Sequence, residues 1–205
     1  MKLYYAPGAC SLATHILLRE AGLSFDLEKV DIRKKTTEHG EDWMALNPKG
    51  YVPALRMDDG DILTENVVLH GYVADLKPEL KLAPAHGTKA RLKQDELAVY
   101  VSTEIHKSYG ALFNPAITDD ARKAAIDKLQ TRYRLIEQLL SDGRTYVTGE
   151  HFTSVDAYLF TVTSWANSLK VDLSAFPKLL AYQQRVAARP AVQAALVAEG
   201  LVKAA

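Results

Sequence analysis

Residues 2–22, KLYYAPGACSLATHILLREAG, hold the pattern that decides the fold of the first part of the chain. Lys2–Tyr5 predicts a short strand, which ends at the turn-forming pair Pro7–Gly8. Ser11 is then a candidate N-cap for a helix that ends at the glycine closing the stretch. The single cysteine of the chain, Cys10, therefore lies at a strand-to-helix junction.

Strand and helix patterns continue to alternate up to about residue 76. An Asp-Asp-Gly-Asp run supplies hairpin chemistry between two of the predicted strands. In chain order we predict a strand at 25–30, a short helix at 41–46, strands at 52–57 and 62–63, and a helix at 65–76. The resulting order, βαβαββα, requires a mixed sheet with helices packed on it.

The character of the sequence changes at residues 77–87, KPELKLAPAHG, where two prolines and a glycine predict a linker. No convincing strand pattern follows. We predict helices at about 85–112, 119–140, 155–169, 177–188 and 190–198. The chain is thus expected to divide into an α+β domain at 1–77, a linker at 78–86 and an all-helical bundle at 87–205.

Composition excludes several classes of partner. Twenty-five basic residues balance twenty-five acidic ones, so no net field attracts nucleic acid or an anionic membrane. One cysteine cannot form an internal disulfide or a zinc cluster, and the six histidines show no metal-ligand grouping, so we predict no metal. No apolar run approaches the roughly 18 residues of a membrane span. We expect a cytoplasmic protein whose partners are small molecules or proteins.

The first long helix predicted in the second half carries two stripes. One consists of apolar residues three and four positions apart, which favours a core face: Leu97, Val101, Ile105, Tyr109 and Leu112. The other places Val99, Thr103 and His106 on a neighbouring face with small or polar groups. We expect that second face to line a cleft.

The segment HFTSVDAYLF, residues 151–160, predicts a capped helix at the centre of the bundle. Thr153 and Asp156 have the spacing of a capping box, in which the carboxylate bonds to the main chain of the N-cap residue. The helix that follows is apolar on nearly all sides, which is typical of a buried helix. We therefore assign Asp156 a structural role.

Four segments, YYAPGACSL, NPKGYVPAL, EIHKSYG and HFTSVDAYLF, occur in an order that resembles a cytosolic glutathione transferase, and the bacterial beta class in particular. The resemblance spans essentially the whole chain, although no single motif is decisive. It implies a thioredoxin-like, glutathione-binding domain followed by an all-helical domain that contributes the electrophile site. It also implies glutathione as the cosubstrate and a homodimer.

The resemblance assigns glutathione contacts to two motifs. The proline matching Pro53 is cis in this family, and the residue before it, Val52, pairs its main chain with the cysteinyl unit of glutathione. Main-chain N–H groups near Glu65 and Asn66, at a helix start, suit the α-carboxylate of the γ-glutamyl unit, and Glu65 suits its ammonium group. From the residues alone, Val52–Pro53 is more often an edge-strand feature. Plain helix capping explains Glu65 and Asn66 as well as ligand binding does.

Further contacts are implied at the other end of the peptide and on the long helix. The lysine matching Lys35 approaches the glycyl carboxylate, and Tyr51 contacts the same end, whereas a solvated loop charge is the alternative for the lysine. Thr103 and the main chain around Glu104 and Ile105 are implied contacts beside His106. Position 99, commonly an asparagine that holds glutathione of the neighbouring subunit, is Val99 here, so one polar contact is missing.

Two residues are the candidate catalytic groups. A cysteine at a helix N-terminus, such as Cys10, is expected to have a depressed pKa, whereas a buried apolar filler is the structural alternative. In the beta class this cysteine forms a mixed disulfide with glutathione, and the histidine matching His106 donates a hydrogen bond near the sulfur or polarises the thiol. The resemblance places the electrophile between the domains, beside Ala9, Tyr109, Phe113 and Trp165.

Three hypotheses about function follow. The leading one is conjugation of the glutathione thiolate to hydrophobic electrophiles. The second is glutathione-dependent thiol-disulfide exchange or peroxidase activity through Cys10, which the lack of a C-x-x-C pair weakens. The third is a non-catalytic ligand-binding protein on the same fold.

Overall fold

A computed structural model describes residues 1–203 of the chain. Its N-terminal part contains one mixed sheet in which β1 runs parallel to β2 and antiparallel to β4. The strand order is β3-β2-β1-β4-β5. The strands are β1 (Lys2–Tyr5), β2 (Asp26–Asp31), β3 (Thr36–Thr37), β4 (Ala54–Arg56) and β5 (Ile62–Thr64). The predicted mixed sheet is confirmed.

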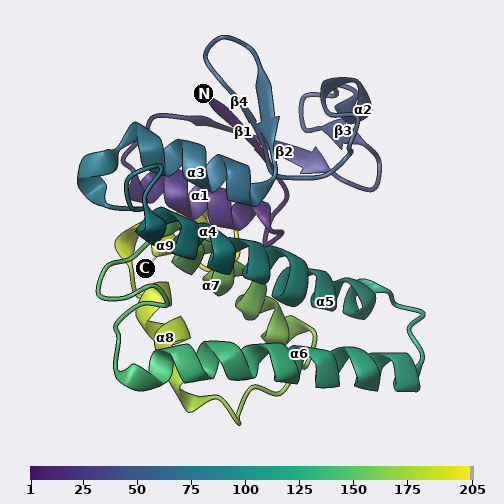
Figure 1. The fold of residues 1–205 in the computed structure, drawn as a ribbon. Coiled ribbons are helices and arrows are strands. Elements are labelled where there is room, and N and C mark those ends of the chain that lie inside the picture. Colours follow the sequence, from purple (N-terminus) through teal and green to yellow (C-terminus); the bar gives the residue numbers. More distant parts are fainter. Residues whose placement is uncertain (204–205) are drawn as a thin grey trace.

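Alternation along β1 gives the sheet its two buried faces. Leu3 and Tyr5 point to the core shared with the helical part, whereas Tyr4 and Ala6 join a smaller core that contains Trp43. The helices of this part are α1 (Ser11–Glu20), α2 (Trp43–Leu46) and α3 (Asn66–Leu76). In Figure 1, α1 and α3 lie between the sheet and the helical part, and α2 lies at the far side of the sheet.

Two details of the sheet differ from the sequence prediction. The strand β3 is only two residues long. It lies antiparallel to the end of β2, with Thr37 opposite Val30, and residues 32–35 form the turn between the two strands. Such a short polar pair has no periodicity from which it could be predicted. The strand predicted from Val52 begins only at Ala54, after the Val52–Pro53 bond, because proline cannot donate to the ladder.

Beyond β5 the structure shows no further strand among residues 65–203. The helices are α4 (Lys89–Tyr100), α5 (Lys107–Tyr109), α6 (Asp119–Leu139), α7 (Ser154–Ser168), α8 (Pro177–Ala187) and α9 (Pro190–Ala198). The predicted helical bundle is therefore confirmed. The first long helix is not uniform, however, because a π-helical segment, Val101–His106, separates α4 from α5, and a 3₁₀ turn at Gly110–Phe113 ends it.

The capping box and the central position of α7 are as predicted. Asp156 is fully buried and accepts hydrogen bonds from the main-chain N–H groups of Thr153 at 2.7 Å and Val147 at 2.9 Å. Tyr182 donates to the same carboxylate at 2.9 Å. Because each of these contacts is structural, Asp156 is explained without any part in chemistry.

The two parts of the chain pack through helices. Helix α1 contacts α7 and α9, and α3 contacts α7 and α4. Figure 1 shows α7 passing behind α4 toward the sheet, with α9 beside α1. The core is continuous across this contact, since Leu17 and Val73 cluster with Val155 and Leu159. Within residues 1–203, no helix combines the length and the apolar character that crossing a bilayer requires.

Candidate functional site

A pocket of about 410 Å³ lies where the N-terminal part meets the helical part. It is lined by residues from both: Cys10, Asn47, Lys49, Tyr51, Val52, Pro53, Thr64, Glu65, Asn66, Val67, Ser102, His106, Lys107, Gly110, Phe113 and Tyr158. The pocket thus brings together the cysteine junction, the proline segment, the start of α3 and the long helix. These regions are separated by up to 148 residues in the sequence.

The loop that carries Cys10 is fixed from both sides. Ser11 is not the side-chain N-cap that we predicted. Its hydroxyl bonds instead to the main chain of Ala6 at 3.2 Å, and Cys10 takes the N-cap position. The helical part clamps the preceding Gly8, whose N–H donates to Glu199 at 2.8 Å and whose carbonyl accepts from the Trp165 indole at 2.8 Å.

The expected low pKa of Cys10 is wrong. Burial raises the pKa of its thiol to about 11, although hydrogen bonding from Asn66 acts in the opposite direction. The thiol also donates to the main-chain carbonyl of Val52 at 3.1 Å, a contact that requires the proton. At neutral pH the cysteine is therefore a thiol, because the position at a helix N-terminus does not compensate for its removal from water.

The start of α3 places a fixed amide beside the cysteine. Asn66 is buried, and its Oδ1 accepts a hydrogen bond from Thr14 at 2.9 Å. The NH₂ group of this amide therefore remains available as a donor to other groups in the site. Glu65 precedes it with φ of 72°, a left-handed conformation that is costly for a residue with a side chain. The Glu65 carboxylate is exposed and pairs with Lys49 at 3.2 Å.

The proline segment forms the opposite wall. The Val52–Pro53 bond is cis, as the resemblance implied. Tyr51 is exposed at the rim, and Asn47 donates to its carbonyl at 2.9 Å. Lys35 does not line the pocket, since its ammonium group donates to the Gly50 carbonyl at 3.0 Å.

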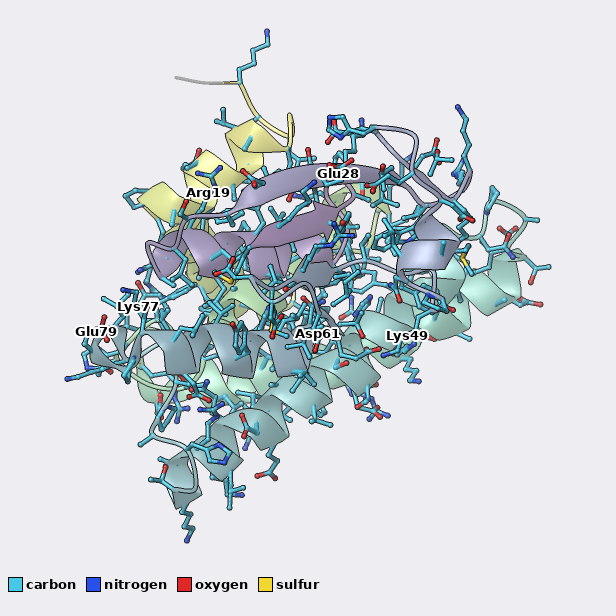
Figure 2. The ribbon with its side chains drawn as sticks, turned by 90° about the horizontal axis from the view of Figure 1, so that it is seen from above. Arg19, Glu28, Lys49, Asp61, Lys77 and Glu79 are labelled. Atoms are coloured by element: carbon cyan, nitrogen blue, oxygen red, sulfur yellow. The ribbon has the colours of Figure 1, made fainter. Side chains whose placement is uncertain are left out.

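The lysines in the pocket wall are Lys107, from the long helix, and Lys49, from the proline segment. Lys49 lies two residues before Tyr51, one of the predicted glutathione contacts. Its ammonium group also donates to Thr64 at 2.7 Å, and its side chain is half exposed. Figure 2 labels it on the surface of the molecule.

The long helix reaches the pocket through a different face from the predicted one. Val99 and Thr103 are exposed outside the pocket, and Thr103 bonds to the carbonyl of Val99. The π-helical segment widens the turn, so that Ser102 and His106 face the pocket. The prediction that residues 99, 103 and 106 share one cleft is therefore wrong within a protomer.

Two further predicted contacts on this segment are engaged elsewhere. Ile105 is fully buried in the core. Glu104 pairs with Arg132 on α6 at 2.7 Å. Neither of these side chains lines the pocket, so the contact expected from their main chain stays a prediction.

His106 is held neutral in an aromatic environment. Burial, and to a smaller extent the charge of Lys107, lower the pKa of its imidazole to about 4. Nδ1 lies 2.7 Å from the hydroxyl of Tyr158, and the ring makes an edge contact with Trp165 at 5.0 Å between centroids. A neutral imidazole carries one N–H, which can donate to an anion in the pocket.

The residues predicted for the electrophile site form a stack beside His106. Phe113 lines the pocket and is half exposed, and its ring meets that of Trp165 at 5.2 Å. Trp165 is buried behind it, and Tyr109 is fully buried behind Trp165 with its hydroxyl bonded to Tyr133 at 2.9 Å. Ala9 does not line the pocket. In this conformation only Phe113 of the four presents a surface to a ligand there.

Comparison with known proteins identifies the family. Residues 8–76 match the model of the glutathione S-transferase N-terminal domain, and residues 93–190 match that of the C-terminal domain. The chain belongs to the glutathione S-transferase family. Glutathione S-transferase GstA of Escherichia coli O157:H7 is 44% identical over 201 residues, covering 98% of this chain and 100% of that protein.

Solved glutathione transferase structures show the same fold. A bacterial beta-class glutathione S-transferase from Sphingomonas chungbukensis is 43% identical with a TM-score of 0.94, covering 98% of this chain and 100% of that one. A sphingomonad glutathione S-transferase complexed with glutathione is 42% identical with a TM-score of 0.94 and the same coverage. The enzyme is therefore close to bacterial glutathione transferases of the beta class.

One grouping of metal-ligating types in the transferase was not predicted. Glu28, Glu38 and His39 place ligand atoms within 4.8 Å of one another. The buried Glu28 carboxylate already accepts from His39 at 2.6 Å and from Lys2 at 3.2 Å, so hydrogen bonds and ion pairs account for the cluster. It lies outside the pocket, and the expectation that no metal is needed stays a prediction.

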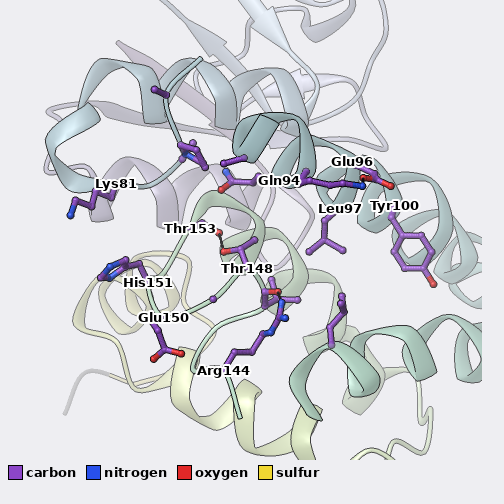
Figure 3. A pocket seen from close by; sticks show the side chains of 18 of the residues that line it. Lys81, Gln94, Glu96, Leu97, Tyr100, Arg144, Thr148, Glu150, His151 and Thr153 are labelled. Carbon is purple, nitrogen blue, oxygen red and sulfur yellow. Dashed lines mark hydrogen bonds and ion pairs between the residues drawn. The ribbon is translucent and has the colours of Figure 1, made fainter. Parts of the chain in front are cut away.

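A larger cavity of about 910 Å³ lies away from Cys10. Figure 3 shows it between α4, which contributes Gln94, Leu97 and Tyr100, and the loop that carries Arg144 and His151. Its lining includes neither the cysteine nor any residue of the proline segment. We therefore assign the chemistry to the smaller pocket.

Sequence reasoning missed Lys49, Ser102 and Tyr158 in the transferase pocket. Lys49 lies inside the recognised segment NPKGYVPAL, two residues before Tyr51, and its charge there was a usable signal. Tyr158 belongs to the segment whose apolar character predicts a buried helix. Its hydroxyl was the missed signal, because a buried tyrosine hydroxyl needs a partner.

Proposed function

We propose that the pocket binds glutathione and transfers its thiolate to a hydrophobic electrophile, with His106 as the hydrogen-bond donor to the sulfur. The observation that carries this proposal is that His106 and the Val52–Pro53 segment line one pocket. The sphingomonad relative complexed with glutathione has the same fold over 98% of this chain, which supports the choice of cosubstrate.

Each part of the tripeptide meets a suitable group in this arrangement. The γ-glutamyl carboxylate lies at the N-terminus of α3, near Asn66, with its ammonium group toward Glu65. The cysteinyl unit pairs with the main chain of Val52, whose carbonyl has a second lone pair besides the one that Cys10 uses. The glycyl carboxylate lies at the opposite end of the pocket, toward Tyr51, whereas Lys49, which pairs with Glu65, adds positive charge at the γ-glutamyl end.

The reaction forms one carbon–sulfur bond. With a chloroarene, the thiolate sulfur bonds to the ring carbon, chloride leaves with its electron pair, and the thiol proton passes to solvent. A thiol with a pKa near 8.5 is ~3% ionised at pH 7, and each unit by which the site lowers that pKa corresponds to about 1.4 kcal/mol. An N–H donor from the neutral His106 stabilises the anion more than the thiol.

Thiol-disulfide exchange through Cys10 is a second candidate, favoured by the position of Cys10 in the pocket wall. In one route a glutathione thiolate attacks a disulfide substrate, forms a new disulfide with one of its sulfurs and releases the other sulfur as a thiolate. In the other route the Cys10 thiolate is the attacking group and forms the mixed disulfide. The raised pKa of Cys10 opposes the second route, because the thiolate is the attacking species. We therefore place conjugation first.

Turnover with two substrates tests the proposal. We expect the protein to be retained on immobilised glutathione and to conjugate glutathione with 1-chloro-2,4-dinitrobenzene. Activity toward a glutathione mixed disulfide without conjugation would instead support exchange. Binding of glutathione with neither activity would support the non-catalytic alternative.

Two further expectations belong to this proposal. The family resemblance implies a homodimer, in which the exposed Val99 lies toward the neighbouring subunit's site. Neutral overall composition favours a cytoplasmic protein without nucleic-acid or membrane partners. Light scattering of the purified protein measures the first of these directly.

A further inference from the structure

Tyr158 on α7 contacts the candidate donor from behind. Its hydroxyl lies 2.7 Å from Nδ1 of His106, and its side chain is almost completely buried. The tyrosine also forms part of the pocket wall. Most residues of helix α7 are buried in the core. The Tyr158 hydroxyl is therefore a polar group at the inner end of the site.

Both partners of this hydrogen bond are neutral, so its direction depends on which of them is the stronger donor. Burial keeps the pKa of Tyr158 well above its ordinary value, so the phenol retains its proton. His106 is neutral, because burial and Lys107 hold its pKa far below 7. A neutral imidazole that accepts at Nδ1 must carry its proton on Nε2. The phenol O–H has a strong acceptor in Nδ1, and this pairing leaves the other ring nitrogen as the donor.

The phenol oxygen is itself oriented by neighbours. Ser102 and Asn66 line the same pocket, and as nearby donors they lower the pKa of Tyr158 against the larger effect of burial. Asn66 can donate there because Thr14 occupies its carbonyl oxygen at 2.9 Å. The partner of the phenol in the structure is Nδ1 of His106 at 2.7 Å, so the single phenol proton is directed there.

Ring packing restricts the alternative orientations. Tyr158 makes edge contacts with His106 at 5.8 Å and with His70 at 5.6 Å between centroids. The other side of His106 meets Trp165 at 5.0 Å. The imidazole is therefore enclosed by aromatic rings, and a ring flip that exchanged its two nitrogens would lose the hydrogen bond at Nδ1.

We propose that Tyr158 is a positioning residue that holds His106 as its Nε2–H tautomer, so that an N–H donor is presented to the sulfur of the cosubstrate. The inference rests on the proposed function for its consequence in catalysis, whereas for the tautomer it rests on the 2.7 Å contact and on the neutral state of both partners. In many enzymes a third group orients the histidine that acts as a base. Here Tyr158 would orient a histidine that acts as a hydrogen-bond donor to a thiolate.

Replacing Tyr158 by phenylalanine removes the hydroxyl and keeps the ring. We expect kcat/KM for conjugation to fall about tenfold, mainly through kcat, because the donor is lost from part of the population. The KM for glutathione should change less than twofold, since the contacts with the peptide remain. Tyr133→Phe is the matched control: its hydroxyl is equally buried and bonds to Tyr109 and Thr163, with no contact to His106.

Nitrogen-15 chemical shifts of the His106 ring test the tautomer without any substrate. In the intact protein and in Tyr133→Phe we expect the proton on Nε2, and in Tyr158→Phe a mixture of tautomers. An Nδ1–H tautomer in the intact protein would overturn the proposal, even if the Tyr158 variant failed to fold. Full activity of a folded Tyr158→Phe variant would overturn it as well.

The two proposals fail in distinguishable ways. If the intact protein does not conjugate glutathione, the proposed function fails, while the ring shifts still decide whether Tyr158 sets the tautomer. If conjugation is present and the shifts do not depend on Tyr158, the proposed function stands and the positioning role is wrong. Circular dichroism of each variant confirms that comparisons are made between folded proteins.

Discussion

The thiol of Cys10 donates to the main-chain carbonyl of Val52 at 3.1 Å, which joins the cysteine junction to the residue before the cis-proline. This contact makes the cysteine a proton donor to the wall of the pocket. It is consistent with a raised pKa and inconsistent with a free thiolate. The candidate activator of glutathione is therefore His106, and Cys10 has a separate role.

Replacing Cys10 by alanine should separate the two roles. Because the thiol is protonated and occupied, we expect conjugation to stay within about threefold of the intact protein, which corresponds to less than 1 kcal/mol. The mixed disulfide with glutathione should disappear, and mass spectrometry after treatment with oxidised glutathione measures this. A hundredfold loss of conjugation in the folded variant would instead make the cysteine the activator.

Lys49 should contribute more to glutathione binding than Lys35. Lys49 lines the pocket, whereas the Lys35 ammonium group is bonded to the Gly50 carbonyl. We expect Lys49→Met to raise the KM for glutathione about tenfold, since an ion pair with a carboxylate at a partly exposed site is lost. Lys34→Met, at an exposed lysine outside the pocket, is the control. Lys35→Met should raise the KM for glutathione less than Lys49→Met does. A larger increase in the KM in Lys35→Met would contradict this prediction.

Asparagine at position 99 should strengthen glutathione binding. Val99 is half exposed and lies outside the pocket of its own protomer. If it faces the site of a neighbouring subunit, Val99→Asn adds one hydrogen bond, worth about 1 kcal/mol or roughly a fivefold decrease in the KM. Val197→Asn on α9 is an exposed control. An unchanged KM in a dimeric protein would contradict this placement.

Stability should decrease as pH falls below neutral because of a buried histidine. Burial lowers the pKa of His70 from 6.5 to about 3. Below pH 6.5 the unfolded chain binds a proton that the folded chain does not bind, so the free energy of unfolding falls toward acid. One such group contributes about 1.4 kcal/mol per pH unit, or up to about 2 kcal/mol between pH 6.5 and 5.

Urea unfolding at several pH values measures this slope. His106, with a pKa of about 4, adds to the loss in the same direction. We expect the slope to be smaller in His70→Leu and unchanged in the exposed-site control His86→Gln. An equal slope in the intact protein and His70→Leu would show that His70 does not govern the acid limb.

Local chemistry explains which features were predictable. The glycine that ends α1, the capping box of Thr153 and Asp156, and the proline segment each follow from a few adjacent residues. Helix bounds in the second half followed from periodicity, since α6, α8 and α9 begin and end within two residues of the predicted positions.

Features that depend on distant residues were not predictable. The pKa of Cys10 is set by burial under side chains from both parts of the chain, so the helix N-terminus alone gave the wrong direction. The π-helical segment breaks the spacing on which the prediction of a Thr103 face depended. Lys49 replaces Lys35 in the pocket wall because the side chain of Lys35 folds back onto Gly50.

The pH dependence of conjugation tests the central claim most directly. In a Cys10→Ala background, kcat/KM for 1-chloro-2,4-dinitrobenzene at saturating glutathione should report the pKa of bound glutathione. With His106 present we expect that pKa to lie at least about one unit below the 8.5 of a free thiol. With His106→Phe it should return toward 8.5, with slower turnover at neutral pH. The same low pKa and the same rate in both proteins would contradict the account, because His106 would then contribute nothing to the thiolate.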